Sequence, residues 1–282
     1  MRQFTDWGQI SAELADNSPG VTWSVAIDRN FLPVARINPT EELPSASIGK
    51  IFILLAVLEQ VDRGTLSLDQ LVEADESDSV TDSGIMQYLS ARRYSIADLC
   101  VLVASVSDNR AANQLIDLVG LQATQQVSRD LGFIHTEMLD RIRDIRLPGQ
   151  AESPSSASAG EVLKMVNMIA KDDRKITGSH QLRRWLSLNT DTSMVASSFL
   201  FDPLAHAIRN QQASVETSAL WNKTGTDATV RADCGSVILN EDTWTYAALA
   251  HWENADPKKA ASVMQDLQAL GAFMAASSQR QN

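Results

Sequence analysis

A serine three residues before a lysine, Ser47 and Lys50, forms the first pair in this 282-residue chain whose types and spacing could do chemistry. The pair opens an apolar stretch, residues 47–62, which predicts a buried helix that ends at Gly64. Residues i and i+3 share one helix face, so the Lys50 amine can reach the Ser47 hydroxyl. An unpaired lysine in apolar surroundings is driven towards its neutral form, which is a base. The pattern predicts a nucleophilic serine beside its base.

Two further polar motifs follow in the chain. Ser107-Asp108-Asn109 lies between two predicted helices, and Lys223-Thr224-Gly225 stands where a predicted strand ends. Alone, the first motif is typical of a helix N-cap and the second of a strand end with a turn glycine. Their order after the serine and lysine, on a helix start, an inter-helix loop and a strand, favours one composite site instead.

The elements that must position these motifs come from both ends of the chain. Residues 3–16 have helical periodicity, and strand patterns at 22–27 and 33–37 flank a polar hairpin turn. Between about 65 and 190 the pattern is mostly helical, and strand patterns return at 217–225, 232–239 and 243–252, before a final helix at about 257–277. We expect an α/β fold, with an antiparallel sheet from both chain ends, flanking terminal helices and an inserted all-helical lobe.

The same pattern predicts how the chain divides. Residues 1–46 and 196–282 form the α/β lobe, and residues 47–195 form the helical lobe. The two lobes make one catalytic unit, with the site between them.

The three motifs and their flanks resemble a known family. The flanks are GTLSLDQ at 64–70, SIADLCVLVASVSDNRAANQLIDLVG at 95–120 and WNKTGTDATVRADCG at 221–235. With these, nearly the whole chain resembles the class A β-lactamase-type serine hydrolases of the β-lactamase and penicillin-binding protein superfamily.

The resemblance implies a role for each motif residue. Ser47 is acylated by a strained cyclic amide, Lys50 is the base, and Ser107 relays a proton to the leaving nitrogen. The backbone N–H groups of Ser47 and Thr226 form the oxyanion hole.

The resemblance also implies the substrate-binding residues. Asn109 holds the side-chain amide of the substrate, and Lys223 and Thr224, with Gly225 of the same motif, bind its carboxylate. Arg231 is a candidate for an extra guanidinium beside that carboxylate, and an ordinary exposed strand arginine is the alternative.

The chain departs from the family in the loop after the helix that follows the second motif. Relatives that hydrolyse β-lactams quickly carry a glutamate there, whereas the two alignments of this loop place Arg143 or Arg146 at that position. A guanidinium stays protonated and is no general base. The nearest carboxylates are Asp140, Asp144 and Glu152, of which we retain Asp144 and Glu152 as candidates for deacylation.

We therefore expect a class A β-lactamase-like hydrolase that opens a β-lactam through a Ser47 acyl-enzyme, with slow deacylation. The alternatives are a penicillin-binding-type acylase or an esterase with another substrate, and a non-catalytic relative that binds a small molecule.

Composition excludes other classes of function. Lys and Arg number 24 and Asp and Glu 35, a net charge of −11, which disfavours binding to nucleic acid. No apolar run is long enough for a transmembrane helix. The two cysteines and four histidines lack metal-ligand spacing, so we expect no metal and no cofactor.

Composition and the chain start also suggest the partners and the compartment. We expect a monomer whose partner is a small carboxylated amide. The amino terminus lacks the pattern of a secretory signal, which predicts a cytoplasmic protein, although a secreted chain whose signal had been removed would look the same.

Overall fold

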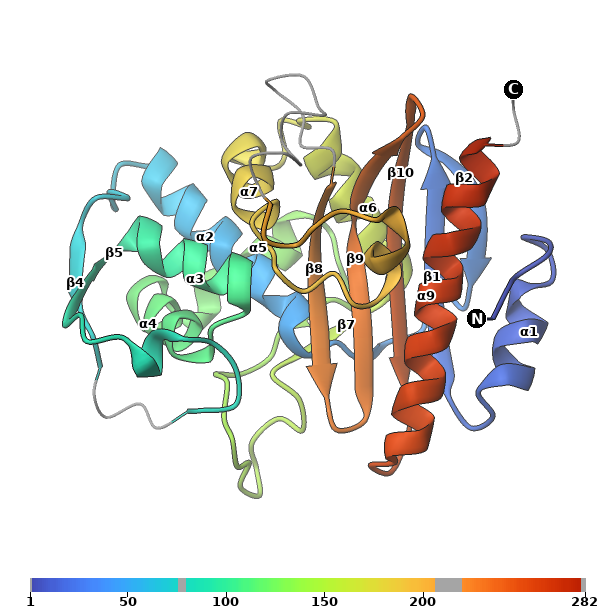
Figure 1. The fold of residues 1–282 in the computed structure, drawn as a ribbon. Helices are drawn as coiled ribbons and strands as arrows, with labels where there is room; N and C mark the ends of the chain where they lie inside the picture. Colours follow the sequence, from blue (N-terminus) through green and yellow to red (C-terminus); the bar gives the residue numbers. More distant parts are fainter. Residues whose placement is uncertain (1, 76–79, 206–219, 280–282) are drawn as a thin grey trace.

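The computed structural model describes residues 2–75, 80–205 and 220–279. Its main sheet has five antiparallel strands in the order β2-β1-β10-β9-β8 (Figure 1). The strands are β1 (Thr22–Arg29), β2 (Leu32–Ile37), β8 (Leu220–Asp227), β9 (Val230–Leu239) and β10 (Asp242–His251). The central pair, β1 and β10, joins the two ends of the chain, which confirms the α/β fold with a shared antiparallel sheet.

The first hairpin follows from its turn residues. Asn30 and Phe31 connect β1 to β2 with φ angles of 51° and 62°, the left-handed conformation of a tight two-residue turn. The predicted residues 217–219 of the first late strand lie outside the described residues, and β8 begins at Leu220.

Helices cover both faces of the sheet. The long C-terminal helix α9 (Pro257–Gln279) lies along one face beside α1 (Ile10–Asn17), and α6 (Ala159–Ala170) packs against β1, β9 and β10 (Figure 1). The predicted first helix starts too early, because α1 begins at Ile10. Phe4 is nevertheless buried, and Trp7 stacks on Trp244, so the segment before α1 packs without forming a helix.

The remaining helices form a second body at one edge of the sheet (Figure 1). They are α2 (Lys50–Asp62), α3 (Ile96–Val106), α4 (Asn109–Val119), α5 (Leu121–Asp130) and α7 (Ser179–Leu186), with 3₁₀ turns η1 (Ala46–Gly49) and η2 (Met86–Tyr88). A third 3₁₀ turn, η3 (Val195–Phe199), packs against α9 instead. Short strands connect them: β3 (Leu43–Pro44), β6 (Glu137–Met138) and β7 (Ser155–Ala157) in one sheet, β4 (Leu71–Glu73) and β5 (Arg93–Ser95) in another.

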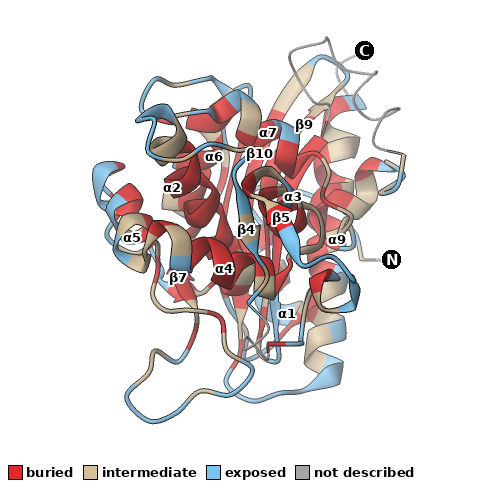
Figure 2. Ribbon diagram, turned by 90° about the vertical axis from the view of Figure 1, so that its left-hand side faces the viewer, coloured by how far each residue is buried: buried red, intermediate tan, exposed pale blue. Residues whose placement is uncertain are grey.

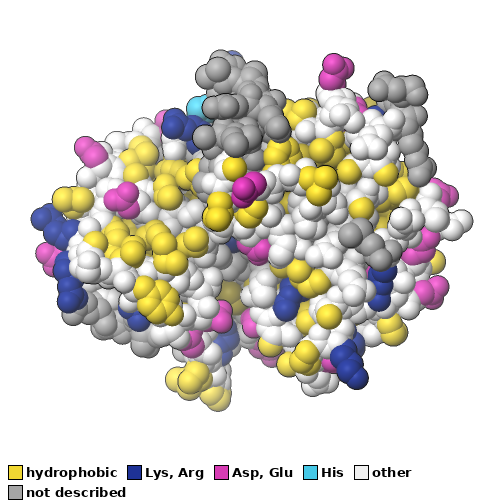
Figure 3. All heavy atoms as spheres, viewed as in Figure 1, with side chains coloured by type: hydrophobic (Ala, Val, Ile, Leu, Met, Phe, Trp, Pro, Cys, Tyr) yellow, Lys and Arg dark blue, Asp and Glu magenta, His cyan; other side chains and the backbone are white. Residues whose placement is uncertain are grey.

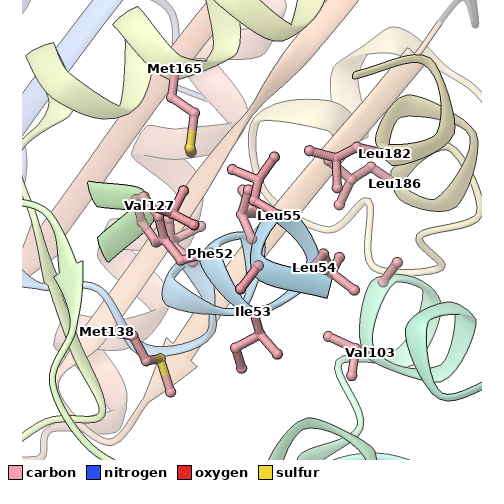
Figure 4. Close-up of a cluster of buried hydrophobic side chains, with 14 of the residues drawn as sticks. Phe52, Ile53, Leu54, Leu55, Val103, Val127, Met138, Met165, Leu182 and Leu186 are labelled. Carbon is pink, nitrogen blue, oxygen red and sulfur yellow. The ribbon is translucent and has the colours of Figure 1, made fainter. Parts of the chain in front are cut away.

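Helix α2 lies at the centre of this body. Every residue from Lys50 to Leu58 is buried, and the surrounding segments contribute apolar side chains from all sides (Figures 2 and 4). Phe52, for example, meets the ring of Phe133 edge-on, with the ring centres 6.3 Å apart. The helix ends as predicted, since Gly64 follows it with a φ of 72°. A helix packed on every face gives its first residues a fixed position.

Candidate active site

Ser47 lies in the 3₁₀ turn η1, immediately before α2. Ala46 enters this turn with a φ of 48°, and its carbonyl accepts a hydrogen bond of 2.6 Å from the Ser155 hydroxyl. A side chain at Gly49 would meet Ser155 at 2.4 Å, so the turn and β7 are in close contact. Ser47 itself is half-buried and lines the cleft described below. The turn therefore presents a serine hydroxyl at a tightly held position.

The Lys50 side chain lies at the base of the same cleft, almost fully buried. Its amine contacts Ser107 O at 2.5 Å, Asn109 Oδ1 at 2.6 Å and Ser107 Oγ at 3.1 Å. The sequence predicts contact with the Ser47 hydroxyl, but the hydrogen bonds of the described residues include none between these two groups. Lys50 is instead oriented by the Ser107-Asp108-Asn109 motif.

Burial lowers the pKa of Lys50 well below its ordinary value, and the positive charge of Lys223 lowers it further. Asp108 and Asp82 oppose this shift through their negative charges. The net direction favours the neutral amine, which can accept a proton.

The second motif joins α3 to α4. Ser107 ends α3 with a φ of 54°, a left-handed conformation that turns its hydroxyl towards two lysines. Its Oγ lies 3.1 Å from Lys50 Nζ and 3.0 Å from Lys223 Nζ. One hydroxyl thus connects the first motif to the third.

Asp108 has a structural role in this loop. Its carboxylate caps α4 at Ala111 N (3.0 Å) and accepts from the backbone N–H groups of Ile85 and Met86, each at 2.7 Å. A Cβ on Gly84 would lie 2.2 Å from the Asp108 carboxylate, so the loop before η2 approaches it closely. The motif is both the helix cap expected of these residue types and part of the site.

Lys223-Thr224-Gly225 lies inside β8, which continues to Asp227, so the prediction of a strand end was wrong. Two more residue pairs, Thr226 with Arg231 and Asp227 with Val230, extend the hairpin to β9. The whole Lys223 side chain is buried, and its amine also donates to Thr224 O at 2.8 Å. Burial lowers the pKa of Lys223 to about 8.

Gly225 brings β8 against the nucleophile turn. A Cβ there would lie 2.4 Å from Ser45 O and 3.2 Å from Ser47 N. Only a glycine permits this approach, which places the backbone of Gly225 beside the Ser47 N–H. Ser47 and Thr226, whose N–H groups are expected to form the oxyanion hole, both line the cleft.

Arg231 is opposite Thr226 in the β9 register, but its guanidinium is engaged locally. It donates to Asp227 O at 2.6 Å and Val230 O at 2.7 Å, and lies over the Trp252 ring. Arg231 is not among the described residues that line the cleft. The structure thus brings the residues of the three motifs together and leaves Arg231 outside the cleft.

A cleft between the helical body and the sheet contains the site, visible as a hollow in Figure 3. It has two parts, of about 360 and about 300 Å³, and Ser47, Asp82 and Thr226 line both. The larger part is completed by the loop before β7, and the smaller by Ser107, Thr224 and the segment 189–191.

The loop before β7 contributes two arginines and one carboxylate to the larger part. Arg143 and Arg146 both pair with Asp140, at 3.0 and 3.3 Å. Burial raises the pKa of Asp140, but its hydrogen bonds and charge contacts with Arg143 outweigh this and lower it overall. Asp140 therefore anchors the arginines rather than facing the nucleophile.

The two candidate deacylation carboxylates differ in position. Asp144 lines the cleft with Ser47 and Lys50, and its Oδ2 accepts from the N–H and hydroxyl of Thr81 at 2.9 and 3.0 Å. Glu152 is exposed and is not among the residues of the cleft.

Three cleft carboxylates, Asp82, Asp191 and Asp227, could not be predicted from the sequence. Asp82 and Asp191 belong to loops outside the three motifs and Asp227 ends β8, and no periodicity or spacing distinguishes them from other surface aspartates. Among residues 2–75, 80–205 and 220–279, no group of three His, Cys, Asp or Glu could hold a metal ion, and no helix is long and apolar enough to span a membrane.

Comparison with known proteins places this geometry in a family. A family model described as the beta-lactamase enzyme family matches residues 8–270. The crystal structure of a beta-lactamase from Sphaerobacter thermophilus superposes with a TM-score of 0.78 at 22% identity, covering 94% of this chain and 96% of that one. A structure of PBP-A superposes at 0.76 with 16% identity, covering 98% and 99%. These likenesses show the fold.

Curated relatives match over shorter segments. The beta-lactamase AER-1 of Aeromonas hydrophila is 26% identical over 186 residues, which are 63% of this chain and 56% of that protein. The beta-lactamase regulatory protein BlaB of Streptomyces cacaoi is 29% identical over 111 residues, 39% and 36% of the two chains. The chain thus matches about a third to a little over half of the length of these relatives.

Proposed function

The chain belongs to the beta-lactamase enzyme family, and we propose that it is a serine hydrolase that opens a β-lactam ring through an ester on Ser47. One observation carries the proposal. The Ser107 hydroxyl lies between the amines of Lys50 and Lys223, at the base of the cleft that Ser47 lines. A nucleophile, a base and a proton relay thus share one cavity.

Acylation begins at Ser47. Its oxygen bonds to the carbonyl carbon of the lactam while its proton passes to the neutral Lys50 amine. The carbonyl oxygen becomes an oxyanion, which the N–H groups of Ser47 and Thr226 stabilise. The lowered pKa of Lys50 supports this assignment, because an amine that is charged at neutral pH cannot accept the proton.

The ring opens when the carbon–nitrogen bond breaks. Ser107 gives its hydroxyl proton to the leaving nitrogen and regains one from the Lys50 ammonium, so both side chains return to their starting state. The 3.1 Å contact between Ser107 Oγ and Lys50 Nζ supports this path. The product is an ester of Ser47 with an open-ring amine.

Asn109, Lys223 and Thr224 hold the substrate on either side of Ser47. Asn109 lines the larger part of the cleft, where it faces the side-chain amide, and Thr224 lines the smaller part, where it binds the carboxylate. Lys223 lies beneath the smaller part and supplies positive charge.

Deacylation requires a water molecule that attacks the ester carbon and loses a proton to a base. The bond between this carbon and the Ser47 oxygen then breaks, and the base returns the proton to that oxygen, which regenerates the serine. Asp144, in the loop before β7, lines the cleft, and we assign it the role of this base. Its Oδ2 is already bound to Thr81, and Arg143 and Arg146 lie on the same wall, so we expect this second step to be slow.

The same loop supports a second candidate function, a penicillin-binding-type acylase. If Asp144 cannot activate water, a β-lactam acylates Ser47 and remains bound, and the natural substrate is another amide or ester. The likeness in fold to PBP-A is compatible with this alternative.

The test is hydrolysis of benzylpenicillin, followed by the loss of β-lactam absorbance, for the wild-type chain and Ser47→Ala. We expect turnover by the wild type and none by the variant. Labelling of Ser47 without turnover would favour the acylase, and turnover retained in Ser47→Ala would refute the assignment of the nucleophile.

A further inference from the structure

Asp191 lies in the part of the cleft where the substrate carboxylate is expected to bind. It lines the smaller cavity together with Ser47, Ser107, Thr224 and Thr226. Asp82 also lines this part, so two carboxylates lie in the region where Thr224 and Lys223 are expected to attract a carboxylate.

The backbone around Asp191 is held in place from both sides. The amides of Asn189 and Asn222 donate to its carbonyl oxygen at 3.1 and 3.2 Å. The N–H and hydroxyl of Thr190 both donate to Ser105 O, at 2.9 and 3.0 Å. Asn222 directly precedes Lys223 in β8 and is completely buried, so the segment 189–191 is fixed relative to the third motif.

The Asp191 side chain is only partly satisfied. Oδ1 accepts from the N–H of Ser193 at 3.1 Å and from its hydroxyl at 2.7 Å, forming a local turn. Oδ2 accepts no hydrogen bond from the residues that the structure describes. The half-buried carboxylate therefore keeps one oxygen available in the cleft.

The charge of Asp191 acts on both cations of this region. Burial lowers the pKa of Lys223 to about 8, and Asp191 is the strongest of the charges that oppose this. Burial also lowers the pKa of Arg231, and there Asp191 opposes the shift after Asp227. Asp191 is thus close enough to act as a counter-ion to Lys223 in the free protein.

We propose that Asp191 determines specificity by competing with the substrate carboxylate for Lys223, so that the site prefers substrates that are uncharged on this side. This inference rests on the proposed acylation of Ser47. A substrate carboxylate that enters the cleft must share Lys223 with Asp191 and is repelled by the negative charge of Asp191. An uncharged ester or amide at that position does not need Lys223 and is not repelled.

The experiment compares benzylpenicillin with its methyl ester, which differ only in the charge of the carboxyl group. The second-order rate constant for acylation of Ser47 is measured by intact mass for the wild type, Asp191→Asn and Asp191→Ser. Asn keeps an Oδ1 for the turn at Ser193, and Ser removes the charge with a shorter side chain. Thermal melting verifies that both variants are folded.

Asp173→Asn is the matched control. Asp173 forms the same kind of turn, accepting from Lys175 N at 3.0 Å, and does not line the cleft. The Asp173→Asn substitution removes one carboxylate from the protein without changing the charge beside Lys223. We expect it to leave the acylation rate constants for benzylpenicillin and for its methyl ester unchanged.

We expect Asp191→Asn and Asp191→Ser to raise the rate constant for benzylpenicillin by about tenfold and to leave that for the methyl ester within about twofold. A rate constant for benzylpenicillin that is unchanged or lower, or an equal gain for both substrates, would overturn the inference while Ser47 acylation stands. If neither compound acylates Ser47 in any of the four proteins, the proposed function fails and this inference fails with it.

Discussion

Lys223 and Lys50 contact the same oxygen, the Ser107 hydroxyl, at 3.0 and 3.1 Å. Burial lowers the pKa of Lys50 well below its ordinary value, and the positive charge of Lys223, whose amine contacts the same hydroxyl, lowers it further. The two lysines therefore have different roles in our proposal. Lys50 is neutral and accepts the proton of Ser47, and Lys223 retains positive charge for the substrate.

Ser107→Ala removes the oxygen that connects the two amines. We expect acylation of Ser47 by benzylpenicillin to slow by about 10²- to 10⁴-fold, because the leaving nitrogen loses its proton donor. Ser128→Ala is the control, since that buried hydroxyl on α5 has no hydrogen-bond partner among the described residues. Rapid-mixing kinetics measure the rate, and an unchanged rate in Ser107→Ala would exclude the relay.

The pKa of Lys223, about 8, predicts how binding depends on pH. Below this value the amine is charged and attracts a carboxylate, and above it the amine loses its proton. The KM for benzylpenicillin should therefore rise as the pH passes through 8, whereas the KM for the methyl ester stays constant. Steady-state or acylation kinetics on either side of pH 8 measure this difference. A parallel rise for both compounds would show that Lys223 does not bind the carboxylate.

Gly225→Ala should separate β8 from the nucleophile turn, because the new Cβ would lie 2.4 Å from Ser45 O. We expect a loss of about 10²-fold or more in the acylation rate, the order of magnitude for a displaced oxyanion-hole donor. Gly8→Ala is the matched control, since its Cβ meets only Asp6 atoms at 3.7 Å or more. Wild-type activity in Gly225→Ala would mean that this close contact does not set the oxyanion geometry.

Asp144→Asn should slow deacylation and leave acylation unchanged, because Asn keeps an oxygen for Thr81 but cannot accept the proton of water. Glu152→Gln tests the other candidate and should have no effect, since Glu152 lies outside the cleft. Decay of the acylated protein by intact mass measures the rate. If only Glu152→Gln slows the decay, Glu152 is the base for deacylation and Asp144 is not.

Replacing an arginine of the loop before β7 by glutamate adds a carboxylate to the cleft. Arg143→Glu is preferable to Arg146→Glu, because Arg146 also donates to two backbone carbonyls, of Ala151 and Arg141. We expect the new glutamate, beside the charge of Asp140, to have a raised pKa suited to a base and to speed deacylation. No change in decay would mean that residue 143 does not face the ester.

The motifs and most helices could be predicted from the sequence because each depends on local pattern. The apolar run of residues 47–62 predicts the buried helix α2, and the polar residues between the first two strand patterns predict the hairpin turn at residues 30 and 31. The strand patterns at both chain ends predict a shared sheet. The division into an α/β lobe and a helical lobe with these boundaries remains a proposal.

The remaining features depend on contacts between distant segments. Lys50 contacts residues 57 and 59 positions away instead of the neighbouring serine, because the left-handed Ser107 places its oxygens within reach. The third motif continues into a longer strand because β9 pairs with it as far as Asp227. Asp191 enters the cleft only through the folding of segment 189–191 against β8 and α3.

The central claim is that Ser47 forms an ester with a β-lactam. The most direct test is intact-mass spectrometry over time after addition of benzylpenicillin, with peptide mapping of the adduct. We predict an adduct of the mass of the whole substrate on Ser47, which decays slowly and is absent from Ser47→Ala. An adduct on any other residue, or no adduct while Ser47→Ala and wild type behave alike, would contradict the account.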